Sequence, residues 1–169
     1  MRQLAIASLL LLAACASQPV SRAPDPPLST VLVNTEQYLG LWHEAALLPN
    51  RFQRDCAGST AEYARRPDGL ISVHNVCRRA DGSTRDIWGR ARRTDAEQGK
   101  LEVSFFGPFW ADYWVLQRAA DYSWSIVGEP SGRYLWVLTR AERITPEQRR
   151  DFSERLQALG YDVDRVIWR

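Results

Sequence analysis

Gly40-Leu41-Trp42 opens the first apolar, strand-like run of the chain, and Arg140 closes a later run in the string YLWVLTR at residues 134–140. A tryptophan that enters a first strand after a glycine can stack, plane on plane, against an arginine that leaves a last strand. Such a stack would plug one end of a closed sheet. The sequence therefore predicts a β-barrel whose base is closed by Gly40, Trp42 and Arg140.

Between these two motifs, short strand-like runs alternate with turn signals, which is the pattern of an antiparallel barrel or sandwich. Pro67-Asp68-Gly69 places proline and glycine where a hairpin turn needs them. Eight strands are expected in this part of the chain. They cover residues 42–48, 59–64, 70–78, 87–92, 101–105, 113–118, 123–127 and 134–139.

After the eighth expected strand, the spacing of apolar residues changes from a period of two to the helical period of 3.6. Thr145 and Gln148 have the spacing of a capping box around Pro146, which suits the first helical position. An apolar stripe follows, and Gly160 is placed to end the helix. Residues 163–168 then predict one more short strand.

The composition is typical of a soluble globular protein, with 45% hydrophobic and 25% charged residues in a length of 169 that suits one domain. A chain of this length buries enough surface to fold without a metal or a dense disulfide framework. The net charge is only +2, and acidic residues are interspersed among the basic ones. Nucleic-acid binding is not expected, because the chain has neither a basic stripe nor a strong excess of positive charge.

The N-terminus carries a basic residue and then an apolar run over residues 4–14 that is too short to span a bilayer. These features predict a secretory signal peptide over residues 1–14. The string LAAC at residues 12–15 resembles the lipobox of bacterial lipoproteins, which implies acylation of Cys15 after cleavage. Ala16 implies, by the same resemblance, sorting to the outer membrane. The alternative is a soluble secreted protein with an incidental cysteine.

The segment at residues 15–34 is rich in proline, serine and alanine, and its prolines interrupt any regular element. This composition predicts a flexible tether between the lipidated cysteine and a barrel domain at residues 35–169. An N-terminal arm that lies on the barrel is the alternative, because the apolar residues 31–33 could pack.

Residues 38–168 resemble the lipocalin family, in particular its bacterial outer-membrane members, with the apolipoprotein D branch more distant. The string YLGLWHE at residues 38–44 is similar to the family's opening motif, although His43 stands where a tyrosine is usual. SFFGPF at residues 104–109 and YLWVLTR at residues 134–140 are similar to later bacterial segments. The resemblance implies an all-β fold, an eight-stranded antiparallel up-and-down barrel with one C-terminal α-helix packed outside and a short final strand.

Cys56 and Cys77 lie at similar distances on either side of the Pro-Asp-Gly turn, so an antiparallel hairpin would bring them together. A disulfide is the expected state, since export supplies an oxidising compartment. The alternative is a reactive thiol, as in lipocalins that isomerise a lipid peroxide.

In a closed barrel, alternate side chains point inward, and an eight-stranded interior can hold one small ligand. Counting by twos from Trp42 places Glu44 and Ala46 inside, and counting back from Arg140 places Trp136 inside. On the other strands, resemblance to ligand-contacting positions of the family extends the set. The expected ligand-binding residues are Tyr63, Asn75, Phe105, Trp114, Trp136 and Glu44.

This mostly aromatic lining suits an acyl chain, and Asn75 and Tyr63 are the expected pair that orients a head group. Core filling is the alternative for each aromatic side chain. For Glu44, a hydrogen-bonded structural carboxylate is the favoured interpretation.

The implied function is to bind, store or transport a fatty acid or lysophospholipid, on the periplasmic side of an outer membrane that acylated Cys15 holds. A lipid-modifying esterase or isomerase and a structural envelope lipoprotein are the alternatives. No catalytic residue is expected, because nucleophile-elbow and phosphate-loop motifs are absent, and His43 and His74 lack metal-ligand spacing. No metal or cofactor is expected either. The sequence leaves open whether the protein forms a homodimer.

Overall fold

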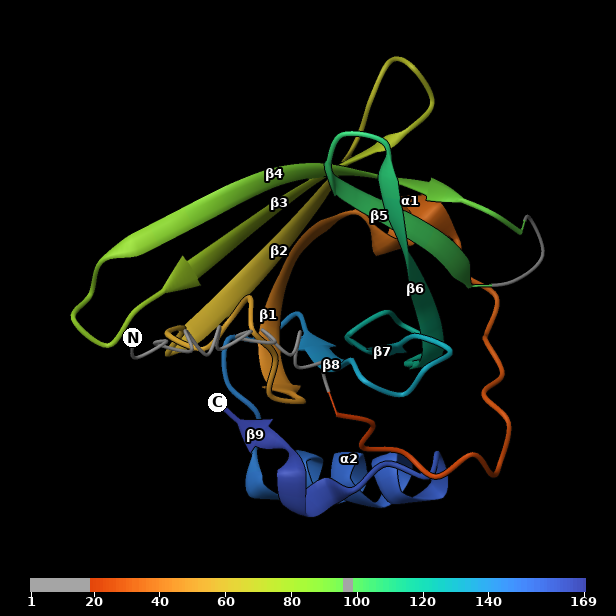
Figure 1. The fold of residues 1–169 in the computed structure, drawn as a ribbon, viewed down its shortest axis with the longest axis vertical. Coiled ribbons are helices and arrows are strands. Elements are labelled where there is room, and N and C mark those ends of the chain that lie inside the picture. Colours follow the sequence, from red (N-terminus) through yellow and green to blue (C-terminus); the bar gives the residue numbers. More distant parts are fainter. Residues whose placement is uncertain (1–18, 96–98) are drawn as a thin grey trace, which may run out of the picture.

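Eight antiparallel strands close into a barrel in the computed structural model, which describes residues 19–95 and 99–169 (Figure 1). Neighbours along the chain pair from β2 to β8, and β1 pairs with both β8 and β2, so the expected up-and-down barrel is confirmed. The strands are β1 (Gly40–Leu47), β2 (Gly58–Arg65), β3 (Ile71–Arg78), β4 (Thr84–Arg93), β5 (Lys100–Phe106), β6 (Phe109–Arg118), β7 (Trp124–Gly128) and β8 (Leu135–Thr139).

The C-terminal strand is shorter than the expected residues 163–168. A 3-10 turn, η1 (Val163–Arg165), takes the first half, and β9 (Ile167–Trp168) pairs with β1 outside the barrel. The Asp162 side chain accepts a hydrogen bond from the Asp164 N–H at 3.2 Å. This contact turns the chain, so that only two residues reach the edge of β1.

Helix α2 (Pro146–Ala158) lies against the outside of the barrel (Figure 1). It begins at the expected capping box. The Thr145 hydroxyl accepts from the Gln148 N–H at 3.2 Å, and the Gln148 side chain accepts from the Thr145 N–H at 2.9 Å. Phe152 and Leu156 are buried under the helix. Within the described ranges, no helix has the length and apolar character that a membrane crossing needs.

A second helix, α1 (Thr35–Tyr38), precedes β1 and was not expected from the sequence. Asn34 caps it by accepting a hydrogen bond from the Gln37 N–H. Four residues give no helical periodicity to detect, and the helix is held by Tyr38, which is buried in the barrel. The segment closes the end of the barrel at which β1 begins.

Apolar side chains form two clusters separated by the barrel wall. One fills the barrel interior and includes Trp42, Tyr63 and Val73. The other lies between the wall and α2 and includes Val137 and Phe152. Strands β1, β6, β7 and β8 supply both layers, because their side chains alternate between the two faces.

A β-bulge in β1 changes the alternation that the sequence predicts. Glu44 pairs with Leu138, but Ala46 pairs with Val137, so Ala45 is an extra residue in the ladder. The prediction that Ala46 faces the interior is therefore wrong, and Ala46 is buried in the outer cluster beside Val137. An inserted residue moves every later side chain to the opposite face.

The described part of the N-terminal segment, residues 19–34, lies along the barrel. The Ser21 N–H donates to the Gly132 carbonyl at 3.2 Å, and the Val31 N–H donates to the Val115 carbonyl at 3.0 Å. These contacts favour an arm packed on the barrel over a free tether for this stretch. The expected signal peptide and Cys15 lie outside the described residues.

Cys56 and Cys77 form the expected disulfide, with a Cα–Cα distance of 5.3 Å. Cys56 lies in the loop between β1 and β2 rather than in a strand, because β2 begins at Gly58. The bridge therefore attaches this loop, residues 48–57, to β3.

Candidate ligand cavity

Arg140 covers Trp42 at the end of the barrel where β1 begins. Its guanidinium carbon lies 3.7 Å from the centroid of the indole ring. The guanidinium also donates to the carbonyls of Leu41 at 2.7 Å, Leu39 at 2.8 Å and Gln37 at 2.9 Å. The structure thus brings together the pair that the sequence singled out, and the same arginine holds the chain that leads from α1 into β1.

Gly40 is required by the backbone at this closure. Its φ angle is +93°, a region that residues with a side chain rarely adopt. A Cβ at this position would also lie 3.4 Å from a guanidinium nitrogen of Arg140. The glycine of the opening motif therefore lets the chain pass under the arginine before Trp42 enters the barrel.

We expect Arg140→Ala to lower the free energy of unfolding by about 2–4 kcal/mol, because it removes a cation–π contact and charge-assisted hydrogen bonds. Urea denaturation followed by tryptophan fluorescence measures the loss. Arg143→Ala is the matched control, since Arg143 is exposed, and its effect should stay within about 0.5 kcal/mol. Equal effects of the two substitutions would contradict the closure role of Arg140.

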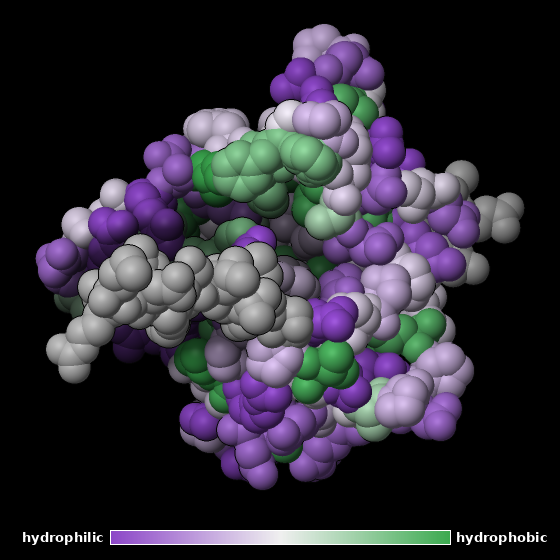
Figure 2. All heavy atoms as spheres, in the orientation of Figure 1, coloured by the Kyte–Doolittle hydropathy of each residue, from purple (hydrophilic) through white to green (hydrophobic). Residues whose placement is uncertain are grey.

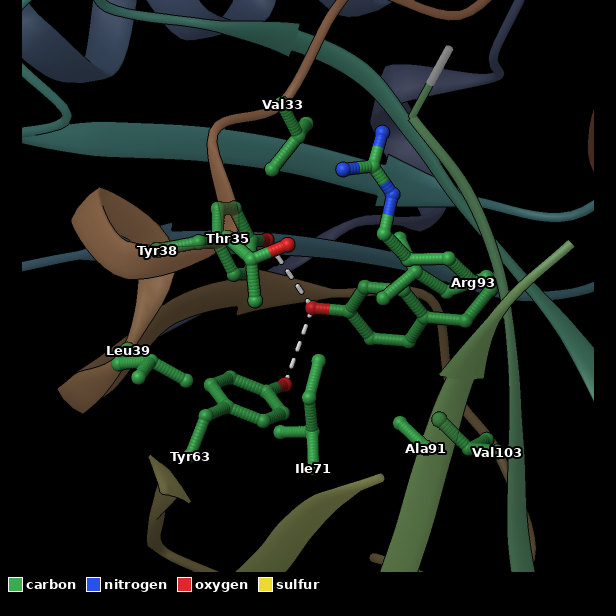
Figure 3. Close-up of a pocket in the computed structure, with 11 residues that line it drawn as sticks. Val33, Thr35, Tyr38, Leu39, Tyr63, Ile71, Ala91, Arg93 and Val103 are labelled. Carbon is green, nitrogen blue, oxygen red and sulfur yellow. Dashed lines mark hydrogen bonds between the residues drawn. The ribbon is translucent and has the colours of Figure 1, made fainter. Parts of the chain in front are cut away.

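Next to this closure, three inward-facing tyrosines, two of them buried and Tyr113 partly buried, join in one hydrogen-bonded chain. The Tyr113 hydroxyl lies 2.9 Å from that of Tyr63 and 3.0 Å from that of Tyr38 (Figure 3). The Tyr38 hydroxyl also lies 2.9 Å from the Ser125 hydroxyl. These four residues come from α1, β2, β6 and β7, so the chain of hydroxyls ties distant elements together across the interior.

The base of the barrel is nearly solid. A cavity of about 20 Å³ remains beside the tyrosines, with apolar walls that include Ile71, Leu101 and Val103. A space of this size holds about one water molecule. Tyr63, which the sequence analysis assigned to ligand contact, therefore forms part of the floor, and its hydroxyl is already used by Tyr113.

Burial raises the pKa of Tyr38 to about 12 and raises the pKa values of Tyr63 and Tyr113 as well. Folding therefore favours the protonated phenols, because an ordinary tyrosine has a pKa of about 10. This contribution to stability is complete below about pH 10 and is lost as the pH rises through the folded-state pKa values.

We expect the barrel to unfold cooperatively above about pH 10, with the buried phenols ionising as it opens. Ultraviolet absorbance of tyrosinate and circular dichroism, recorded on the same samples, should change together. Tyr63→Phe, which removes one buried ionisable group, should move the transition to higher pH. Complete ionisation of all six tyrosines in a chain that keeps its native circular dichroism would contradict the buried network.

Above this floor, the interior wall is partly exposed. Phe105, Trp136 and Asn75 pack on or beside the inner cluster, yet each keeps intermediate exposure. Inward-facing side chains reach solvent only where the interior is open. Figure 2 shows a recess on this side of the molecule, next to hydrophobic residues over the β5–β6 turn. These partly exposed inner residues mark the half of the barrel away from Trp42 as the candidate ligand site.

The Phe105 ring packs on Gly89, which has no side chain. A Cβ on Gly89 would lie only 2.6 Å from the Phe105 ring. Gly89 pairs with Val73, which is in the inner cluster, so the phenylalanine ring lies on the inner face of β4. The glycine therefore leaves room for the ring to pack directly on the β4 backbone.

Asn75 provides an acceptor without a partner. It lies in one row with Ala61 and Ile87 on the inner face. Its Oδ1 atom is buried and has no hydrogen-bond partner among the described residues. A buried acceptor left unpaired costs about 1–3 kcal/mol, so this atom is suited to receive a donor from a ligand or a water.

Trp114 does not line the interior. It belongs to the layer packed against the outer cluster, and the Lys100 ammonium lies 4.9 Å from its ring centroid. Its neighbours Tyr113 and Val115 belong to the inner cluster instead. The expected inward position of Trp114 is therefore wrong by one residue of register, and Tyr113 is the residue that the sequence analysis missed. Tyr113 pairs with the inward-facing Leu101, and this pairing, which fixes the inner face of β6, comes from the tertiary structure.

Glu44 is fully engaged by the protein. Arg169, the C-terminal residue, donates to Glu44 Oε1 at 2.9 Å, and the Gln53 side chain donates to Glu44 Oε2. Burial raises the pKa of this carboxyl, while the charge of Arg169 opposes the rise. These contacts agree with the favoured interpretation of Glu44 as a structural carboxylate.

Gln53 was also missed by the sequence analysis. It belongs to the β1–β2 loop and accepts hydrogen bonds from the Trp136 indole N–H and the Asn50 side chain, both at 2.9 Å. It donates to Glu44 and, at 3.2 Å, to Ser59. The loop thus lies over the barrel mouth beside Trp136. A single glutamine in a polar loop carries no pattern that would have identified it.

Two polar groups on the outside of the barrel, His74 and Asp55, are each paired with another side chain. His74 lies on the outer surface, stacked on Trp88 at 4.0 Å, with its Nε2 atom 2.8 Å from an Asp86 oxygen. Among the described residues, the group with metal-ligand spacing is Asp55 with the two bridged cysteines. Asp55 is already paired with Arg79, whose hydrogen bond lowers its pKa.

Comparison with known proteins gives consistent matches. Residues 33–169 match a family described as a lipocalin-like domain. The chain is 34% identical to the outer membrane lipoprotein Blc of Escherichia coli K12, over 97% of this chain and 92% of that protein. It is 30% identical to apolipoprotein D of Oryctolagus cuniculus, over 96% and 89% of the two chains. Insecticyanin from the tobacco hornworm Manduca sexta has the same fold, with a TM-score of 0.68, 20% identity and coverage of 85% and 84%.

Proposed function

This chain belongs to the lipocalin family, and from that premise we propose that it binds, stores or carries a small elongated apolar molecule, a fatty acid or lysophospholipid, without transforming it. Family membership fixes the architecture and the class of function, because members place different cargo in similar barrels. The nature of the ligand must therefore be argued from the interior of this barrel.

The proposal depends on one observation, the contrast between the two halves of the barrel. Below, Tyr63 and Tyr113 are joined by a hydrogen bond beside a cavity of only about 20 Å³. Above them, Phe105 and Trp136 remain partly exposed on the inner wall. An acyl chain could enter from the open end and lie along these aromatic faces until it meets the tyrosines. Its burial would contribute roughly 25 cal/mol per Å² of apolar surface.

Asn75 supports a ligand that carries a hydrogen-bond donor. Its buried Oδ1 atom lacks a partner among the described residues. The free hydroxyl of a lysophospholipid can donate to this atom, whereas an ionised fatty-acid carboxylate can only accept. We therefore favour a hydroxyl-bearing acyl lipid over a free fatty acid.

The location that we propose is the periplasmic side of the outer membrane, with the protein attached through acylated Cys15. Two features support this location: the LAAC string before residue 16, and the relatives of this length that are named outer membrane lipoproteins. We also propose that the protein is a carrier and not an enzyme, which an esterase assay on lysophospholipid substrates would test.

We expect Phe105→Ala and Trp136→Ala each to weaken lysophospholipid binding about tenfold, equivalent to about 1.4 kcal/mol, because each removes an aromatic face from the wall. Trp114→Ala is the matched control on the outer face and should leave the affinity unchanged. Isothermal titration with each purified variant measures the affinities, and circular dichroism verifies the fold. Unchanged affinity in both inner variants would refute the cavity assignment.

Asn75→Leu separates the two ligand classes. The substitution replaces the amide with an apolar side chain of similar size, so it should weaken binding of a lysophospholipid about five- to tenfold. The affinity for a fatty acid of the same chain length should change by less than about twofold at neutral pH. Equal losses for both ligands would contradict the assignment of a donor to Asn75.

A further inference from the structure

We propose that the open end of the barrel faces the phospholipid bilayer that carries the lipid anchor, with Phe106 and Phe109 inserted among the lipids. The inference rests on the proposed acylation of Cys15 and goes beyond it, since acylation by itself sets no orientation. Three observations carry it: where the N-terminal arm is attached, how many residues precede that attachment, and where exposed aromatic side chains gather.

The first described contact of the arm is at the open rim. Ser21 donates its N–H to the carbonyl of Gly132 in the turn between β7 and β8. This turn lies at the opposite end from Trp42 and Arg140, because β8 begins at Leu135 and runs toward that closure. Two residues later, the Ala23 N–H donates to the Gly160 carbonyl at 2.9 Å, so the attachment is reinforced.

The segment between Cys15 and the first described contact at Ser21 is short. Cys15 and Ser21 are six positions apart in the sequence. A fully extended chain spans at most about 3.6 Å per residue, so an anchor at Cys15 stays within about 20 Å of the rim. β1 contains eight residues and is therefore about 26 Å long. Strands of such a barrel tilt by about 35–45° from its axis, so β1 covers about 20 Å of the barrel's height, to which α1 and the turns at the closed end add. A segment attached at the rim would have to be fully extended merely to span the strands, so its attachment favours the open end as the end that faces the membrane.

Among the described residues, three of the four exposed aromatic rings lie at the rim, and the fourth, Trp88, stacks on His74 on the outer wall. Phe106 and Phe109 flank the β5–β6 turn and are 65% and 76% exposed. Phe52 in the β1–β2 loop, on another part of the same rim, is 51% exposed. Figure 2 shows hydrophobic residues gathered over the β5–β6 turn, beside the recess. Large exposed apolar groups at one end of a protein indicate an interaction surface.

The charge beside these rings suits a bacterial phospholipid surface. Arg51 and Arg54 in the β1–β2 loop are exposed, and the Arg51 guanidinium lies 4.9 Å from the Phe52 ring centroid. Arginine next to an exposed aromatic ring is a suitable contact for anionic head groups, since each basic residue near such a surface contributes about 1 kcal/mol. A bilayer therefore satisfies both the apolar and the charged parts of the rim.

This orientation would allow a lipid to move directly between the bilayer and the barrel interior. An acyl lipid that leaves the bilayer would pass from the membrane directly between the rim aromatics and onto Phe105 and Trp136. The apolar chain would then not cross bulk water, whose contact with it is costly.

The orientation can be tested on the full acylated protein in vesicles of phosphatidylethanolamine and phosphatidylglycerol. A single environment-sensitive dye is attached through Phe109→Cys or, as the matched control, through Leu41→Cys. Leu41 is 46% exposed and lies at the closed end. The native cysteines do not interfere, since Cys56 and Cys77 are bridged and Cys15 would be acylated.

The dye at position 109 should be quenched by lipid-phase quenchers and protected from aqueous iodide, while the dye at position 41 should behave in the opposite way. Equal exposure of both dyes to water, or protection at position 41 alone, would overturn the proposal. So would protection at position 109 that requires no vesicles and grows with protein concentration, because that result would identify a second copy of the chain as the partner.

A second measurement separates this inference from the proposed function. The double variant Phe106→Ser, Phe109→Ser should take up a fluorescent lysophospholipid from vesicles about tenfold more slowly, with its equilibrium affinity for the dispersed ligand unchanged. Leu41→Ser should match the wild-type protein in both respects. An unchanged uptake rate in the double variant would count against docking at the rim. Absence of lysophospholipid binding in every protein would refute the proposed ligand, while the dye positions would still decide the orientation.

Discussion

The stack of Arg140 on Trp42 is the interaction on which the rest of the barrel depends. An eight-stranded sheet can close on itself only if its two ends are brought together, and here the arginine that ends β8 covers the tryptophan of β1. The same guanidinium holds the carbonyls of the chain between α1 and β1. One planar, permanently charged group therefore closes the sheet, caps its base and fixes the entry of the first strand.

The closure also determines which half of the interior is available. Because Tyr38 enters with α1 directly beside Trp42, with ring centroids 5.0 Å apart, the tyrosine hydroxyls meet at the base and leave little space there. Away from the base, the wall includes Gly89, which has no side chain, and the inward rings keep part of their surface exposed. A packed floor and an open mouth in one barrel are the features on which the proposed carrier role rests.

The mouth combines groups that come from distant parts of the chain. The β1–β2 loop is attached to β3 by the disulfide, and its Gln53 contacts both Trp136 and Glu44. Arg169 reaches Glu44 from the last position of the chain. The rim is therefore fixed by covalent and polar contacts, while Phe106 and Phe109 expose most of their surface.

The sequence by itself determined the barrel, its closing pair, the outer helix and the disulfide, because each depends on a local pattern or on a residue type with few alternatives. Only the tertiary structure decided which side chains face the barrel interior. The bulge at Ala45 reversed the direction of Ala46, and Trp114 pointed outward where Tyr113 points inward. The physical reason is that side chains alternate with a period of two, so one inserted or miscounted residue exchanges the inside of a barrel for its outside.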